Sequence, residues 1–364
     1  MKVLMTADAV GGVWTYAVDL CRGLAQHGVE VVLATMGPAP SAAQQRCMGA
    51  LPNVRLNVGP WKLEWMDDPW SEVTAAGEWL LELARRERVE LVHVNGFAHA
   101  ALAFGRPCIC VAHSCVCSWW QAVHDESAPP AWDRYRQTVA EGLCAATFVI
   151  APTHAFFATL QSLYGPIFSG TVIHNGYECA ESPALRREPL IVACGRAWDV
   201  AKNLATLDAA VGELPWQACV AGDATSPDGR TLCLHSLRSL GALAPDELRG
   251  WMRRAAIFAH PARYEPFGLA VLEAASHGCA LVLSDIPSLR ELWDGAALFA
   301  PSREPQAFRA QLMRLISRPD ERAALAQLAI DRAQKFRAER MCGEYAALYG
   351  RLVRSAGHQE LAVA

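Results

Sequence analysis

Residues 263–278, RYEPFGLAVLEAASHG, combine two carboxylates with the start of a predicted helix. Glu265 stands in a predicted loop, and Gly268 leaves backbone N–H groups open to an anion. Glu273 follows eight residues after Glu265, in a helix that is otherwise apolar. A carboxylate in that setting needs hydrogen-bond donors, which sugar hydroxyls would supply. The structural alternative is a capping glutamate together with a buried salt bridge.

Two further loops carry groups that suit a phosphate. CGRAWDVAKN follows a predicted strand and places Arg196 and Lys202 in a short loop that leads into a helix. These cations could hold a diphosphate, although a solvated basic loop would have the same sequence. DAVGGVW follows the first predicted strand, and the adjacent Gly11 and Gly12 let its backbone approach a phosphate closely. A structural turn is the alternative there, and the pattern is not the G-x-G-x-x-G of dinucleotide sites.

The segment PCICVAHSCVCSWW (107–120) places four cysteines close to His113. A zinc site is one interpretation, but zinc knuckles favour two-residue gaps within a cysteine pair, and the gaps here are one residue. In an extended strand, Cys108 and Cys110 would share one face, with the residues between them on the other. We therefore expect a buried strand that ends just before His113, and no metal site.

The composition is that of a soluble globular protein with more than one domain: 364 residues, 52% hydrophobic and 19% charged. A formal net charge of −4 gives no general attraction to nucleic acid or anionic lipid. The first residues reach Asp8 before any long apolar run, so we expect no signal peptide, and no run approaches the ~18 residues of a spanning helix. Thirteen cysteines in such a chain are typical of free thiols. We expect a cytoplasmic protein, with peripheral membrane contact left open.

Short apolar runs alternate with helical patterns along the whole chain. Strands are predicted at 2–7, 29–35, 53–58, 89–94, 107–112, 147–151, 171–174, 189–195, 217–223, 256–261, 280–285 and 297–301. Helices are predicted at 14–26, 71–88, 131–143, 153–163, 203–213, 245–254, 268–278 and 305–317, with an unbroken helical tail over 319–355. This alternation predicts parallel sheets covered on both faces. The fold class is therefore α/β, with two doubly wound Rossmann-like domains.

The pattern restarts after a polar, proline-bearing segment, ESPALRREP. The predicted domains are 1–172, an N-terminal acceptor domain, and 189–340, a C-terminal nucleotide-sugar domain. Residues 173–188 form the predicted crossover, and 341–364 the C-terminal helix and tail. A ligand in such folds lies at the carboxyl ends of the strands, so we expect it in a cleft that the two domains face.

The spacing E-x₇-E, with Glu265 and Glu273 inside EPFGLAVLEA, resembles the signature of the retaining family-4 glycosyltransferases of the GT-B fold. The likeness extends along nearly the whole chain, through the glycine pair, GR…KN, TVIHNGYE, SDIPSLREL and a C-terminal helix. It implies a GT-B fold in which that helix packs back towards the N-terminal domain. The chain departs from the family at His174, where a proline is frequent, and near Ala262, where a serine is frequent.

The resemblance also implies a role for each matching residue. Arg196 and Lys202 match the basic pair that holds the donor diphosphate, and Glu273 matches the glutamate that binds the ribose. Glu265 and His113 match groups beside the donor sugar and are the catalytic candidates. The other matches are backbone positions at the phosphate or sugar: Gly11, Gly12, Phe267, Gly268 and Leu269.

These features predict a retaining glycosyltransferase that moves a sugar from a nucleoside-diphosphate donor to a hydroxyl acceptor. Cations and helix N-termini can stabilise the leaving diphosphate, so no metal or other cofactor is expected. The partners are then a sugar nucleotide, with UDP, GDP and ADP all open, and the acceptor, but not nucleic acid. A sugar-nucleotide epimerase of the same build and a non-catalytic sugar-nucleotide-binding subunit are the alternatives.

Aromatic residues are the candidates for the acceptor side. Trp119 and Trp120, with Trp132, could form a platform for a sugar ring or simply a folded hydrophobic loop. WKLEWMDDPW (61–70) is a second candidate for the same role. Three histidines without a surrounding pattern are expected to be structural: His99, His124 and His260.

Overall fold

The computed structural model describes residues 1–178, 187–226, 229 and 231–363. The chain forms two compact units. Unit 1 comprises the described parts of Met1–Gln121, Glu126–Glu178 and Ala338–Ala364, and unit 2 those of Ala122–Asp125 and Cys179–Arg337. The predicted crossover, 173–188, lies partly outside the described residues.

Unit 1 is built on a sheet of seven parallel strands in the order β3-β2-β1-β4-β5-β6-β7. The strands are β1 (Lys2–Asp8), β2 (Glu30–Met36), β3 (Val54–Val58), β4 (Leu91–Val94), β5 (Cys108–Val111), β6 (Phe148–Ala151) and β7 (Gly170–Val172). The central strands are buried along their whole length, as expected of a sheet covered on both faces. All seven agree with the predicted strands to within two residues at each end.

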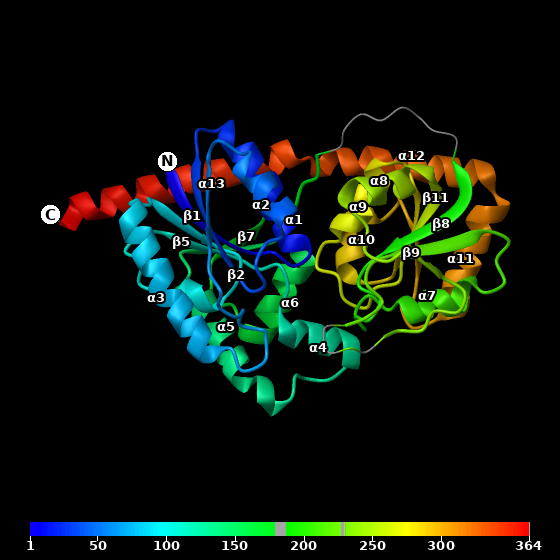
Figure 1. Cartoon of the computed structure of the whole chain (residues 1–364), viewed down its shortest axis with the longest axis horizontal. Helices are drawn as coiled ribbons and strands as arrows, with labels where there is room; N and C mark the ends of the chain where they lie inside the picture. The colour runs from blue at the N-terminus through cyan, green and yellow to red at the C-terminus, as the bar shows by residue number, and fades with distance from the viewer. Residues whose placement is uncertain (179–186, 227–228, 230, 364) are drawn as a thin grey trace. The chain divides into compact units, whose positions relative to one another are not determined.

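Helices cover both faces of this sheet (Figure 1). They are α1 (Gly12–Ala25), α2 (Ala42–Gly49), α3 (Trp70–Glu87), α4 (Val116–His124), α5 (Asp133–Ala145), α6 (His154–Tyr164) and α13 (Ala338–Val363), with 3₁₀ turns η1 (Ala98–Ala101) and η2 (Pro130–Trp132). The sequence analysis missed α2 and α4. The first is a short polar helix held by a capping box between Ser41 and Gln44, and such a helix has no apolar period to detect.

The C-terminal helix belongs to the core of unit 1. Its Tyr345 and Tyr349 are fully buried with α1 and with the β1 side chains Val3 and Met5. Ile109 and Val111 of β5 share this core, while Cys108 and Cys110 do not, which confirms the predicted faces of that strand. The expectation that the last helix packs back on the N-terminal domain is therefore confirmed.

Unit 2 has a sheet of six parallel strands in the order β10-β9-β8-β11-β12-β13. The strands are β8 (Glu188–Cys194), β9 (Gln217–Ala221), β10 (Arg238–Ser239), β11 (Ala255–His260), β12 (Ala280–Ser284) and β13 (Leu298–Ala300). The helices are α7 (Leu204–Val211), α8 (Pro245–Arg254), α9 (Leu269–Ser276), α10 (Pro287–Trp293), α11 (Pro305–Ser317) and α12 (Pro319–Ala333), followed by the 3₁₀ turn η3 (Gln334–Phe336). The two Rossmann-like units confirm the predicted fold class.

The predicted continuous tail helix over 319–355 is wrong. Helix α12 ends at Ala333, η3 follows, and Arg337 is extended before α13 begins at Ala338. The sequence did not predict this break, because the residues around it all favour helix and no glycine or proline marks the turn. Phe336, within the break, is buried. The break also separates the units, since α12 belongs to unit 2 and α13 to unit 1.

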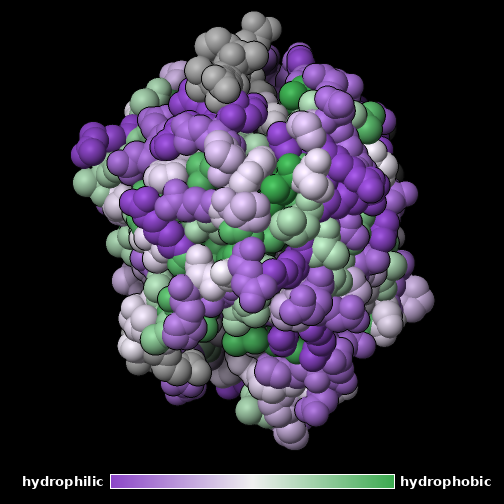
Figure 2. Space-filling model, turned by 90° about the vertical axis from the view of Figure 1, so that its right-hand side faces the viewer, coloured by the Kyte–Doolittle hydropathy of each residue, from purple (hydrophilic) through white to green (hydrophobic). Residues whose placement is uncertain are grey.

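The face of the molecule in Figure 2 is mainly hydrophilic, with hydrophobic residues in small groups among the polar ones. The large apolar side chains that the structure exposes are spread along the chain: Val58, Trp65, Ile167, Val200, Met313 and Leu328. Among the described residues, no helix is at once long enough and apolar enough to cross a bilayer.

Candidate functional site

Each sheet reverses its strand order at one point. In unit 1 the chain runs outwards from β1 through β2 and β3, and then returns to place β4 on the other side of β1. In unit 2, β8 has β9 on one side and β11 on the other. The loops beyond the carboxyl ends of two such strands diverge and leave a crevice, which is where doubly wound sheets bind ligands. The predicted glycine pair follows β1 and the predicted charged residues follow β8 and β11, whereas His113 follows β5, one strand beyond the switch point of unit 1.

In unit 2, the loop after β8 is packed tightly against the end of β9. Gly195 and Ala197 donate N–H groups to Ala221 O at 2.9 Å and to Asp223 O at 2.7 Å. Gly222, at φ +140°, allows this approach, because a Cβ there would lie 2.0 Å from Gly195 O. The backbone that carries Arg196 is therefore fixed from both sides.

Arg196 and Asp199 form a short-range pair within this loop. The Arg196 guanidinium lies 2.8 Å from an Asp199 carboxylate oxygen and over the Trp198 ring at 5.0 Å. The other Asp199 oxygen accepts the N–H of Ala201 at 2.9 Å. Arg196 keeps 45% of its side chain exposed, so its charge is positioned but still available to a ligand.

Lys202 and Glu265 form the central ion pair of this site, with an Nζ–Oε2 distance of 2.8 Å. His260, at the end of β11, donates from Nε2 to the same oxygen at 3.1 Å. Burial would raise the pKa of Glu265, but Lys202 and His260 hold that pKa well below its usual range. Burial would lower the pKa of Lys202, but Glu265 more than offsets this and raises it. Both partners therefore stay charged at neutral pH.

The loops after β8 and β11 are bonded to each other. Arg263 donates its N–H to Ala201 O at 2.8 Å, and Asn203 donates from its amide to Pro261 O at 2.8 Å. Asn203 has a left-handed φ of 57°, a conformation that asparagine tolerates better than most residues. Ser288 of α10 donates its hydroxyl to Glu265 O at 2.5 Å. These bonds hold the predicted basic loop against the predicted carboxylate loop.

Gly268 lies directly before α9 with a left-handed φ of 91°. The helix thus begins at Leu269, later than Pro266 would allow, and Glu265 remains in the loop. Phe267 is buried against the Phe336 ring at 6.0 Å between centroids, which fixes the turn. The backbone at 267–269 therefore lies beside Glu265 as predicted, and its contact with sugar or phosphate stays a prediction.

Glu273 lies in the second turn of α9, 17% exposed, with Arg249 of α8 at 3.9 Å. Burial, and then the charges of Glu273 and Glu265, raise the pKa of Cys194 to about 11. Cys194 ends β8, so both glutamates act on the same strand end as Lys202 does. The four charged residues predicted in this half of the chain are thus brought together.

In unit 1, Gly11 and Gly12 lie at the exposed start of α1. Gly11 is at φ 77°, and nothing lies within 4 Å of the position of an added Cβ. The first turn of α1 has no acidic residue, and no side chain caps it. The loop is therefore open at a helix N-terminus, as a phosphate-binding turn requires.

His113 follows β5 and is held by β4. Its Nε2 lies 2.8 Å from Asn95 Oδ1, and the Tyr16 ring packs edge-on with a centroid distance of 4.5 Å. Burial, and then His93, lower the pKa of His113 to about 3. The imidazole is therefore neutral at physiological pH.

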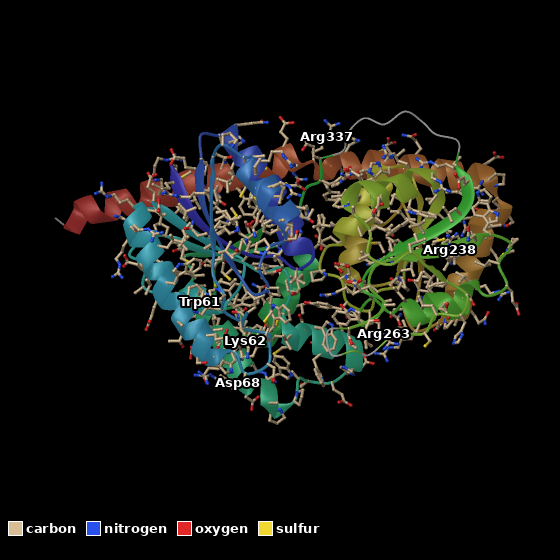
Figure 3. All side chains as sticks on the ribbon, in the orientation of Figure 1. Trp61, Lys62, Asp68, Arg238, Arg263 and Arg337 are labelled. Atoms are coloured by element: carbon tan, nitrogen blue, oxygen red, sulfur yellow. The ribbon has the colours of Figure 1, made fainter. Side chains whose placement is uncertain are left out.

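The aromatic acceptor candidates are partly used in packing. Trp119 and Trp120 are half-buried on α4, with ring centroids 5.9 Å apart, and Trp132 packs on Tyr135. In the second candidate segment, Trp61 packs on Trp79 at 4.7 Å, near Lys62 and Asp68 (Figure 3). Their contact with an acceptor stays a prediction.

Glu64, in that second segment, is a structural capping group. Its carboxylate accepts the N–H groups of Phe97 and Ala98 at the start of η1, at 2.6–3.2 Å. Burial raises the pKa of Glu64, and these two N–H groups lower it by less.

The cysteines near His113 do not form a metal site in the part of the chain that the structure describes. No group of three or more His, Cys, Asp or Glu side chains there is arranged to hold an ion. Cys108 and Cys110 are buried in β5, and Cys115 donates to or accepts from the Tyr164 hydroxyl at 3.0 Å. All cysteines among these residues are free thiols.

Four residues of the site were not assigned to it from the sequence. His260, expected to be structural, donates to Glu265, and its place directly at a strand end was the available signal. Asn95 and Ser288 act through hydrogen bonds to residues on other elements, which no local sequence pattern predicts. Arg263 (Figure 3) has a buried Nε without a hydrogen bond among the described residues, and burial, then Arg303, lower its pKa.

Two family models match the chain in succession. Residues 10–181 match Glycosyltransferase Family 4, and residues 188–318 match Glycosyl transferases group 1. The chain belongs to the family-4 glycosyltransferases of the GT-B fold. Together the two models match parts of both units of this glycosyltransferase, including every predicted site residue, and end before α12 and α13.

Relatives of known activity match the glycosyltransferase over part of its length. A glycogen synthase of Mycobacterium tuberculosis is 32% identical over 149 residues, which cover 36% of each chain. A D-inositol 3-phosphate glycosyltransferase of Corynebacterium urealyticum is 31% identical over 116 residues, 31% of this chain and 27% of that protein. The chain thus spans about a third of the length of these relatives.

Solved structures match the fold over nearly the whole chain. A sucrose-phosphate synthase from Thermosynechococcus elongatus superposes with a TM-score of 0.81 at 17% identity, covering 98% of this chain and 100% of that one. Anabaena HepE in complex with UDP-glucose gives 0.76 at 18% identity, covering 97% and 100%. At such identity these likenesses establish the GT-B fold alone.

Proposed function

We propose that this protein transfers a sugar from a UDP-sugar to a hydroxyl acceptor, with retention of the anomeric configuration and without a metal ion. The observation that carries the proposal is the pairing of Lys202 with Glu265 at the switch point of unit 2, beside Arg196 on the same loop. A cation, a carboxylate and an uncapped helix N-terminus lie at the same end of the sheet. Together they suit a sugar diphosphate better than the cation or the carboxylate would alone.

The leaving diphosphate needs positive charge at the moment the glycosidic bond breaks. Lys202 stays protonated because Glu265 raises its pKa, and Arg196 is exposed enough to reach a ligand. Preorganised charges of this kind stabilise a developing anion without reorganisation. They supply what a magnesium ion would otherwise supply, which is why we propose metal-independent transfer.

Glu265 lies beside the donor sugar in this account, and Glu273 beside the ribose. The C1–O bond to the β-phosphate breaks, its electron pair goes to the phosphate oxygen, and the acceptor oxygen bonds to C1 on the same face. The acceptor proton passes to the departing phosphate. Glu265 is ionised, so it stabilises the positive charge that develops on the sugar ring.

UDP is the proposed nucleotide because HepE, which shares the fold over nearly the whole chain, was solved with UDP and with UDP-glucose. Both curated relatives are sugar transferases that act on hydroxyl-bearing acceptors, by their names. We therefore propose a polyol or glycan hydroxyl as the acceptor, with the half-buried tryptophans of α4 as its platform.

The experiment is a thermal-shift screen of UDP-, GDP- and ADP-sugars, followed by a turnover assay with the best donor in excess EDTA. A ligand that binds the native state raises the unfolding temperature. We expect the largest shift with a UDP-sugar, and UDP release that depends on an added hydroxyl acceptor and persists in EDTA. Lys202→Ala is the control and should reduce both signals.

Two outcomes would contradict the proposal. Turnover that EDTA abolishes and magnesium restores would reject metal independence. UDP release without any acceptor dependence would favour an epimerase, and binding without turnover over a broad acceptor panel would favour a non-catalytic sugar-nucleotide-binding subunit.

A further inference from the structure

A hydrogen-bonded chain inside unit 1 joins the last helix to His113. The Tyr349 hydroxyl of α13 lies 2.6 Å from Nδ1 of His93 on β4. Nε2 of His93 lies 3.0 Å from Oδ1 of Asn95, and Nε2 of His113 lies 2.8 Å from the same oxygen. Two imidazoles thus share one amide oxygen.

The orientation of Asn95 decides where the protons are. Its side-chain nitrogen lies 2.6 Å from the carbonyl oxygen of Thr6, and its backbone N–H donates to the Thr6 hydroxyl at 2.9 Å. A carbonyl oxygen can only accept, so the NH₂ group of Asn95 must face Thr6. The amide oxygen therefore faces the two histidines, and it too can only accept.

Both histidines must then donate through Nε2. For His93 this leaves Nδ1 as the acceptor of the Tyr349 hydroxyl, which is protonated because burial raises its pKa far above the usual value. Burial lowers the pKa of His93 to about 4, and burial together with His93 lowers that of His113 to about 3. Each ring is neutral, with one proton in a fixed place.

In His113, Nε2 donates to Asn95, and Nδ1 is unprotonated. Nδ1 makes no hydrogen bond to any described residue and carries a lone pair. The titratable groups packed around the two rings are tyrosines: Tyr16 from α1, and Tyr345 and Tyr349 from α13. None of them supplies the negative charge that would protonate an imidazole at physiological pH.

We propose that Asn95 is a positioning residue that locks His113 as the neutral Nε2–H tautomer and so presents Nδ1 as a hydrogen-bond acceptor for a hydroxyl of the donor sugar. This inference rests on the proposed function for the identity of the ligand, but not for the tautomer. It makes His113 a hydroxyl acceptor and excludes it as a proton donor to the leaving group. It also gives α13 a part in the site, through Tyr349 and His93.

The tautomer is tested by nitrogen-15 NMR of the imidazoles in the histidine-labelled full chain. We expect His113 and His93 to show protonated Nε2, unprotonated Nδ1 and slowly exchanging Nε2–H protons. His174 is an internal reference of the opposite kind, because its Nδ1 donates to Pro152 O at 2.8 Å. A protonated Nδ1 on His113 would overturn the proposal, whether or not a sugar nucleotide binds.

Two substitutions at Asn95 separate positioning from packing. Asn95→Ala removes the shared acceptor, so the slowly exchanging Nε2–H signals of both histidines should disappear. Asn95→Leu fills a similar volume without supplying an acceptor, so it should lose these signals as Asn95→Ala does. An unchanged His113 signal in Asn95→Ala would contradict the proposed role.

Binding measurements with two ligands test the sugar contact. Asn95→Ala should weaken UDP-glucose by about 3- to 10-fold, the loss of one hydrogen bond, while UDP alone binds as in the wild type. Tyr349→Phe should have a smaller effect of the same kind, and Tyr345→Phe is its matched control, because that ring stacks on His93 at 5.5 Å without a hydrogen bond to it in the described structure. An equal loss of UDP and UDP-glucose affinity in Asn95→Ala would overturn the sugar contact. Failure of the wild type to bind UDP would instead contradict the proposed function.

Discussion

The two switch points of this glycosyltransferase have the same topology and opposite chemistry. In unit 2, the strand ends carry full charges: Arg196, Asp199, Lys202 and Glu265 pair with one another within 2.8 Å. In unit 1, β4 and the segments after β4 and β5 carry His93, Asn95 and His113, which are neutral and linked by hydrogen bonds.

We propose from this difference that the two sheets recognise different parts of the ligand. Charged groups held by other charges suit a diphosphate, because binding can replace one ionic partner by another at low cost. A neutral network with fixed donors and acceptors suits hydroxyl groups, which need direction but not charge. One fold repeated twice thus offers two kinds of recognition, set by a handful of residues at the strand ends.

The largest effect should come from removing the carboxylate of the charged site. Glu265→Gln keeps the size of the side chain but loses the negative charge that we propose stabilises the sugar ring, so turnover should fall at least about 100-fold. UDP affinity should stay the same or increase, because Lys202 is then freed for the diphosphate. The measurement is steady-state turnover beside UDP binding, and a variant with normal turnover would contradict the role of Glu265.

A glycine-to-alanine substitution should destabilise the loop after β8 in unit 2 more than the loop after β1 in unit 1. Gly222→Ala places a Cβ 2.0 Å from Gly195 O, so the loop that carries Arg196 must move. We expect a loss of about 2–3 kcal/mol in the free energy of unfolding, and weaker UDP binding. Gly11→Ala, at φ 77° and ψ −143° with open space around it, meets backbone strain without a steric clash and should cost less, about 1–2 kcal/mol. Denaturant unfolding of both variants is the check, and equal losses would contradict the packing argument.

Acid should destabilise both units through buried neutral histidines. Burial lowers the pKa of His93 in unit 1 to about 4, and burial with nearby arginines lowers that of His277 in unit 2 to about 4. Between about pH 6.5, the pKa of a histidine in the unfolded chain, and about pH 4, these histidines bind protons in the unfolded chain but not in the folded one. The free energy of unfolding therefore falls as the pH drops through this range. Each histidine should contribute up to about 1.4 kcal/mol per pH unit.

Substitution of a histidine separates its contribution to acid destabilisation from that of the other titratable groups. His277→Gln should reduce the slope of unfolding free energy against pH by about one proton, measured by denaturant unfolding between pH 5 and 7. His27→Gln, at an exposed position, is the control and should leave the slope unchanged. A slope that neither substitution alters would show that these histidines are not the cause.

Most of the scaffold was predictable because it depends on local patterns. Continuous apolar runs predicted the strands of both sheets except the exposed two-residue β10, and the glycines before α1 and α9 lie at the helix starts. Helix α4 was not predicted, although its apolar residues recur with a helical period. The break at Arg337 was missed because the residues around it all favour helix.

The proximity of Lys202 and Glu265 could be expected from the sequence because both follow strands that lie side by side in the sheet, while their role in binding stays a prediction. The site was not predictable where a residue acts on another across the sheet. Asn95 matters only because β4 lies between β1 and β5, so that its amide reaches Thr6 on one side and His113 on the other. These contacts depend on the order of the strands in the sheet, so the spacing of the residues along the chain cannot predict them.

The most direct test of the account is calorimetric binding of UDP to the wild type, Lys202→Ala and His113→Ala. If the charged switch point holds the diphosphate, Lys202→Ala should weaken UDP by about 10- to 100-fold, since it removes a charge-assisted bond. His113→Ala should leave UDP affinity unchanged, because we propose that His113 contacts the sugar and not the nucleotide. Normal UDP binding by Lys202→Ala together with its loss in His113→Ala would contradict the division of labour between the two sheets.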